Sequence, residues 1–184
     1  MNAVLGQKIA EIRINKLAIN VASVPLTLML LGGLVTVASS LPHFQSISFP
    51  EPYWMLLVLL SLIIIHEALH ASALICWSRI PWSDCKFGVM WKALMPYCHC
   101  GKPITVRAYR FYALFPLIVT GSMSLLYLFV YPSFWSAFLS AVVLAVCIGD
   151  VWVYCRMWRF EGNLLVLDAR SEIGCDIFTW PAEE

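Results

Sequence analysis

The sequence predicts an integral membrane protein with an all-α membrane part, and three observations carry this prediction. The composition is strongly apolar, the apolar residues gather into four long segments, and the basic residues are confined to a few loops. Of the 184 residues, 61% are hydrophobic and only 12% are charged, and the mean hydropathy is +0.80. Because a soluble domain carries about 25% charged residues, the composition excludes a soluble globular protein.

Four apolar segments are long enough to cross a bilayer as helices. They cover about residues 17–39, 54–77, 108–131 and 133–154. A helix rises about 1.5 Å per residue, so roughly 20 residues cross a hydrocarbon core of about 30 Å. In so short a chain we expect a single integral-membrane domain over residues 17–157.

The Lys and Arg residues predict the orientation of these spans. Three of the 12 precede the first span, six lie between the second and third spans or at the start of the third, and three follow the fourth. The other two loops contain none. Since basic residues stay on the cytoplasmic side, we expect both termini to be cytoplasmic in a multi-pass protein of a prokaryotic plasma membrane. No dense basic run suggests nucleic acid as a partner.

Both ends of the chain are predicted to be short cytoplasmic segments. Residues 1–16 have mixed polarity, and Val4, Leu5, Ile9 and Ile12 lie at helical spacing, which predicts an amphipathic N-terminus. No small-residue cleavage site follows the first apolar run, so we expect a retained span there. The tail, residues 158–184, contains two strand-like runs at 164–167 and 176–180, with a turn at 168–174 between them.

The segment between the second and third spans is predicted to form strands. Residues 86–92 and 94–100 are short runs typical of β-structure, and a tight connection joins them. We therefore expect a small β-hairpin on the cytoplasmic side, over about residues 84–102. The predicted fold is thus four transmembrane helices with one hairpin.

The motif His66-Glu67-Ala68-Leu69-His70 lies inside the second predicted span. At 100° per residue, both histidines and the glutamate face one arc of a helix. Two imidazoles there can hold one Zn²⁺, and Glu67 can take the proton of a zinc-bound water. Ionisable groups at membrane depth cost several kcal/mol unless they pair or bind something. A bundle in which the three groups only satisfy each other is the alternative.

A catalytic zinc also needs a third protein ligand, and Asp150 in the fourth span is the strongest candidate. From the outer ends of their spans, His66 lies about 18 Å, His70 about 24 Å and Asp150 about 25 Å into the membrane. Pairing of Asp150 with Arg156 is the alternative. Two further acidic residues, Glu161 and Asp168, are weaker ligand candidates because they lie in the tail.

The cluster Cys98-His99-Cys100 leaves three interpretations open. His99 could lie beside the zinc and donate to a developing oxyanion. The cluster could join Cys85 in a structural zinc site, although alternation along a strand points His99 away from the cysteines. It could also be an ordinary strand with one polar residue. All seven cysteines fall in cytoplasmic or inner segments, where disulfides are not expected.

Taken in order, these segments resemble the DUF3267 family of putative zincin peptidases, which is similar to the site-2-protease-like (M50-type) intramembrane zinc metalloproteases. The resemblance covers about residues 54–175 and rests on the following pieces: the His66–His70 motif, Tyr97 to Cys100 before Pro103, Phe115-Pro116, Gly149-Asp150, Val166 to Asp168 and Ile173-Gly174. It implies a three-helix metalloprotease core behind one N-terminal span. It also implies zinc held by His66, His70 and Asp150, with Glu67 as the base.

The chain departs from the site-2 pattern around its aspartate. That family has an Asn-Pro-Asp-Gly-type sequence that helps to hold the substrate, whereas Asp150 follows Cys147-Ile148-Gly149 here. His99 could take over that role.

The predicted function is a zinc-dependent intramembrane endopeptidase that holds one Zn²⁺ per chain. Its predicted partners are the lipid bilayer and a transmembrane or membrane-proximal peptide, which could add as a strand to the hairpin edge. The alternative is a non-catalytic membrane binding or assembly protein with a structural metal site. A transporter is disfavoured, because the four spans lack duplicated halves.

Overall fold

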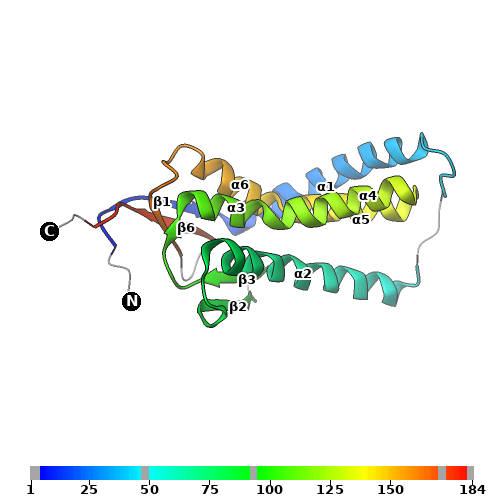
Figure 1. Cartoon of the computed structure of the whole chain (residues 1–184). Helices are drawn as coiled ribbons and strands as arrows, with labels where there is room; N and C mark the ends of the chain where they lie inside the picture. Colours follow the sequence, from blue (N-terminus) through cyan, green and yellow to red (C-terminus); the bar gives the residue numbers. More distant parts are fainter. Residues whose placement is uncertain (1–4, 47–49, 92–94, 170–172, 182–184) are drawn as a thin grey trace.

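The computed structural model of the chain describes residues 5–46, 50–91, 95–169 and 173–181. Long helices run side by side, and small β-sheets gather at one end of them (Figure 1). As predicted, four helical segments are long and apolar enough to cross a membrane: Leu17–Ser39, Pro52–Ser78, Val106–Val130 and Phe134–Met157. The protein therefore has the build of a multi-pass membrane protein.

The first two spans are single helices. α1 (Lys16–Ser39) begins after Asn15, whose side-chain oxygen accepts hydrogen bonds from two backbone N–H groups of the first turn. α2 (Pro52–Ser78) begins with a proline, at a position where a helix needs no N–H donor. It ends at Arg79, which adopts the left-handed conformation with φ of 53°.

The third and fourth spans are both interrupted near the middle. The third consists of α3 (Val106–Pro116), the π-helical turn η2 (Leu117–Gly121) and α4 (Ser122–Val130). The fourth consists of α5 (Phe134–Val146) and α6 (Ile148–Met157), which meet at Cys147. Interruptions of this kind often occur at functional sites, because they redirect side chains and release backbone groups.

A hairpin follows α2, as the sequence predicts. After the short 3-10 turn η1 (Trp82–Asp84), β2 (Cys85–Met90) pairs antiparallel with β3 (Met95–Cys100). The register places Cys85 opposite Cys100. The predicted tight connection at 92–94 lies outside the described residues.

A second sheet shows that the predicted all-α class is incomplete. Its four antiparallel strands are β1 (Lys8–Ile14), β4 (Ile104–Thr105), β5 (Leu165–Asp168) and β6 (Ile173–Phe178), in the order β1-β6-β5-β4. The strand-like runs of the tail supply β5 and β6. The centre of the turn between them, residues 170–172, lies outside the described residues.

The N-terminal segment forms a strand, so the helical spacing read in the sequence was misleading. Along β1, Ile12 and Ile14 are buried while Glu11 and Arg13 are exposed. This alternation has a period of two, which fits a strand with one face against the core. Val4, which belonged to the helical pattern, lies outside the described residues.

The main core lies where the helices meet the sheets. Its fully buried side chains come from α2, α3, α6, β5 and β6, and they include Leu74, Val106, Met157, Val166 and Ile177. This core fixes α2, α3 and α6 relative to β3. The polar side chains on those elements are thereby held at fixed positions.

Gly174 is expected to be a sensitive position in the sheet. Its φ is +135°, and a Cβ there would collide with the backbone carbonyl of Ile12 on β1. We expect Gly174→Ala to lower the free energy of unfolding by about 2–3 kcal/mol. Denaturation in detergent measures this loss. Gly162→Ala is the matched control, because its Cβ would meet only ordinary contacts, and an equal loss in both variants would contradict the prediction.

Candidate metal centre

α2 places His66, Glu67 and His70 next to the core of the bundle. The two imidazole rings lie one helical turn apart, with centroids separated by 4.9 Å and planes nearly perpendicular. The His70 side chain is 6% exposed and the His66 side chain 12%. Inside a membrane protein, groups this polar and this buried need partners.

The partner of both histidines is Asp150, which lies in the first turn of α6. One carboxylate oxygen, Oδ2, is 3.1 Å from His66 Nε2, and the other, Oδ1, is 3.4 Å from His70 Nε2. The structure thus brings together the three ligands predicted from the sequence. The amino-terminal turn of a helix also favours a negative charge, which suits Asp150 at the start of α6. The carboxylate contacts the histidines rather than Arg156.

His70 is oriented by a backbone carbonyl of α3. Its Nδ1 lies 3.0 Å from the carbonyl oxygen of Tyr112. Because a carbonyl can only accept, Nδ1 must carry the proton and donate it. In the neutral imidazole, Nε2 is then the unprotonated nitrogen, and it faces Asp150. The contact therefore fixes the tautomer that a metal ligand needs.

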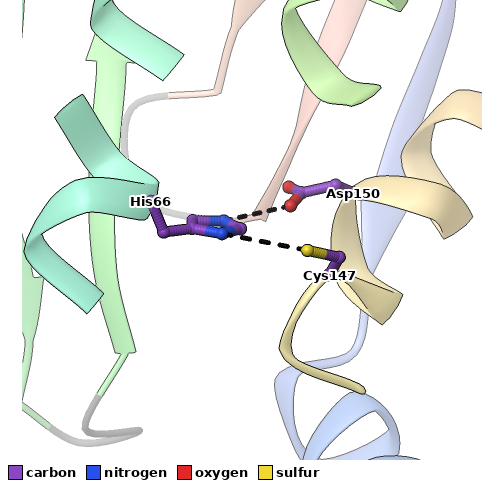
Figure 2. A group of neighbouring side chains, drawn as sticks. All are labelled: His66, Cys147 and Asp150. Carbon is purple, nitrogen blue, oxygen red and sulfur yellow. Dashed lines mark hydrogen bonds and ion pairs between the residues drawn. The ribbon is translucent and has the colours of Figure 1, made fainter. Parts of the chain in front are cut away.

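Cys147, at the break between α5 and α6, also lies next to His66. Its Sγ is 3.9 Å from His66 Nδ1, and its thiol donates to the Val143 carbonyl at 3.3 Å. Figure 2 shows Asp150 and Cys147 near each other, and both face the His66 ring. Among the described residues, these three form a group whose possible ligand atoms lie within 4.8 Å of one another. His70 is not a member of this group, but it contacts Asp150.

Sequence reasoning missed both Cys147 and Tyr112. Cys147 precedes Asp150 by three residues, so the spacing alone places both on one side of a helix. Tyr112 precedes Pro116 by four residues, and a proline leaves the carbonyl at that spacing without its helical donor.

The glutamate of the motif lies against the hairpin. Glu67 and Cys98 on β3 border the same cavity. The Tyr112 hydroxyl, from α3, donates to the carbonyl of Cys98 on β3 at 2.8 Å. α2 and α3 therefore both hold β3 at the site.

His99 on β3 faces a buried carboxylate from the tail. Its Nδ1 lies 3.7 Å from Asp168 Oδ2, and Asp168 also accepts hydrogen bonds from the Tyr109 hydroxyl and the Cys100 backbone N–H at 2.5 and 2.7 Å. Burial raises the pKa of Asp168 above its ordinary value, against the effect of these donors. Asp168 is thus engaged in joining β3, α3 and β5, and Glu161 is exposed. Among the described residues, the ion pairs of His66 and His70 are with Asp150, and neither Asp168 nor Glu161 pairs with either histidine.

A cavity of about 530 Å³ connects these groups. Its wall includes the histidines, Glu67, Asp150, His99 and Asp168, together with a polar stripe from α1: Asn20, Ser23 and Thr27. Cavities of this volume commonly bind small ligands or part of a peptide. All predicted site residues therefore border one space.

The structural zinc site considered at Cys85, Cys98, His99 and Cys100 finds no support. Within the part of the chain that the structure describes, these four do not form a group with metal-ligand spacing. The cysteines are buried and free. Burial raises the pKa of Cys100 to about 11, so its thiol stays protonated at neutral pH.

Comparison with known proteins identifies one related family. The family described as "Putative zincin peptidase" (DUF3267) matches residues 59–165, which covers most of α2, the hairpin, the third and fourth spans and the start of β5. No curated protein and no solved structure matches the chain.

Proposed function

Because the chain belongs to the DUF3267 family of putative zincin peptidases, we propose that it is a zinc-dependent endopeptidase that cleaves a peptide bond within or next to the membrane. The observation that carries the proposal is the meeting of Asp150 with both motif histidines beside Glu67. The family implies a zinc ion, and we propose one per chain.

The donor set suits zinc in its chemistry and its spacing. Two imidazole nitrogens and one carboxylate are a common ligand set of catalytic zinc, with the fourth position left open. Two ligand atoms around a tetrahedral Zn²⁺ lie about 3.3 Å apart, for bonds of about 2.0–2.1 Å. The nitrogen–oxygen separations of 3.1 and 3.4 Å, each to a different oxygen of Asp150, are close to this value.

The side chains around the site fit peptide hydrolysis. When bound, zinc lowers the pKa of a water molecule and polarises a carbonyl group. Glu67 accepts the proton of the attacking water and delivers it to the departing amine. His99 donates to the oxygen of the former carbonyl as negative charge develops there. Asp168 faces Nδ1 of His99 and leaves Nε2 for the substrate.

The substrate is proposed to lie in the cavity rather than along the inner end of β3. The Cys98 carbonyl and the Cys100 N–H already bond to Tyr112 and Asp168, so that part of the strand edge cannot pair with a peptide. Pro96 and Tyr97 lie nearer the tip of the hairpin and border the cavity. A substrate peptide could begin to pair with β3 at these two residues.

The proposed orientation keeps the predicted sidedness. The sheets, together with the basic segments before α1, after α2 and after α6, face the cytoplasm. The site then lies toward the cytoplasmic half of the membrane, and a transmembrane or membrane-proximal peptide reaches it from there.

One observation favours a second candidate, a membrane protein with a structural metal. If the Cys147 sulfur joined the two histidines and Asp150, four protein ligands would close the site. The Cys147 sulfur is 3.9 Å from His66 Nδ1, whereas Asp150 contacts Nε2, and this difference supports the open site instead.

The decisive experiment measures zinc and hydrolysis on the same preparation. The full chain is purified in detergent, its metal content is determined, and cleavage of a labelled transmembrane peptide is followed. We expect about one zinc per chain, loss of cleavage with a chelator, and recovery when zinc is restored.

Cobalt distinguishes the two candidates. An intense sulfur-to-cobalt charge-transfer band in the Co²⁺-loaded protein, lost in Cys147→Ser, would support the closed structural site. A spectrum without that band, together with zinc-dependent cleavage, supports the peptidase. A chain that binds no zinc contradicts both.

A further inference from the structure

We infer that Pro116 is a positioning residue for the metal centre, because it releases the Tyr112 carbonyl that orients His70. This inference rests on the proposed metal site and adds to it a residue that touches neither metal nor substrate. Pro116 is a helix-breaking residue inside a membrane span, where an interrupted helix leaves backbone groups that need other partners.

In an uninterrupted α-helix, the Tyr112 carbonyl would accept from the N–H of residue 116. Residue 116 is a proline and has no N–H. The next donor along the chain, the Leu117 N–H, bonds to the Leu114 carbonyl. The Tyr112 carbonyl therefore has no helical partner from either position.

A carbonyl without a partner is costly inside a bilayer, where water cannot satisfy it. Here the His70 Nδ1–H satisfies it at 3.0 Å, in a buried contact. The same hydrogen bond directs His70 Nε2 toward Asp150. The α3 carbonyl that lacks a helical donor and the buried His70 N–H on α2 thus satisfy each other, and the hydrogen bond fixes the orientation of His70 as a ligand.

The π-helical turn directly after Pro116 accommodates the break. η2 begins at Leu117, and the Thr120 hydroxyl donates to the Pro116 carbonyl at 2.7 Å. The backbone beyond the proline is therefore satisfied locally, and the Tyr112 carbonyl remains available to α2.

The test is Pro116→Ala in the full chain. Alanine restores an N–H that competes with His70 for the Tyr112 carbonyl. We expect the zinc dissociation constant, measured by chelator competition, to rise about 10- to 100-fold, as it does when an outer partner of a ligand histidine is lost. The melting temperature of the metal-free protein should change little, because the better helix propensity of alanine offsets the cavity left by the buried proline ring.

Pro25→Ala is the matched control. Pro25 also lies inside a spanning helix, α1, but it is exposed. This variant should leave the zinc dissociation constant unchanged. An NMR measurement gives a second readout: the hydrogen-bonded Nδ1–H proton of His70 should be observed in the original protein and lost in Pro116→Ala.

Two results would overturn the inference. One is a zinc affinity in Pro116→Ala equal to that of the original protein. The other is an equal loss of affinity in Pro25→Ala, which would indicate a general effect of proline on the bundle. If the original protein itself binds no zinc, the proposed function fails rather than this inference alone.

Discussion

Replacing Glu67 by Gln is expected to lower the rate of peptide cleavage by about 100- to 10,000-fold, the usual contribution of a general base. Glutamine has nearly the shape of glutamate but cannot accept the proton of the attacking water. Because Glu67 is not one of the proposed ligands, the variant should still contain one zinc per chain. Single-turnover cleavage of a labelled transmembrane peptide, together with metal analysis, measures both properties.

Glu161→Gln is the control for this experiment. Glu161 carries the same functional group, but it is exposed in the tail segment after α6. Its replacement should change neither zinc content nor rate. Cleavage by Glu67→Gln at the original rate would remove Glu67 from the mechanism. Loss of zinc in the same variant would instead place Glu67 among the metal ligands.

The helical part of the fold could be predicted because its cause is local. Each span is a long apolar run, and the bilayer requires such a run to form a helix that satisfies its own backbone. The hairpin was also predictable, because β2 and β3 are close in sequence and joined by a short connection.

The second sheet could not be predicted in the same way. β1 pairs with β6 across most of the chain, with Glu11 opposite Asp176, and nothing in the sequence near either strand indicates the other. Short segments such as Lys8–Ile14 carry apolar residues that fit both helical and alternating patterns. Only the partner strand and the core beneath it decide between them.

Some residues of the candidate site could likewise be predicted from the sequence, and others could not. The spacing of His66, Glu67 and His70 is a property of one helix, and the depth of Asp150 follows from the topology of the spans. The structure brings these groups together, although metal binding itself stays a prediction. Cys147 and the Tyr112 carbonyl depend on how two spans are interrupted and packed. Their role requires the three-dimensional arrangement of α2, α3 and α6.

The other large effect is expected from Asp150→Asn. Asparagine keeps the shape of the side chain but removes its negative charge. The two histidines then no longer contact a carboxylate, and zinc loses a strong ligand. We expect the zinc dissociation constant to rise by more than about 100-fold, beyond the upper limit for loss of an outer partner, and cleavage to fall with it. Metal analysis after dialysis and chelator competition measure this change.

Asp168→Asn is the matched control, since it alters a buried aspartate that borders the same cavity but contacts His99 rather than His66 or His70. That variant should keep one zinc per chain. If zinc persists in Asp150→Asn and is lost in Asp168→Asn, the third ligand is Asp168, and the tail rather than α6 completes the site.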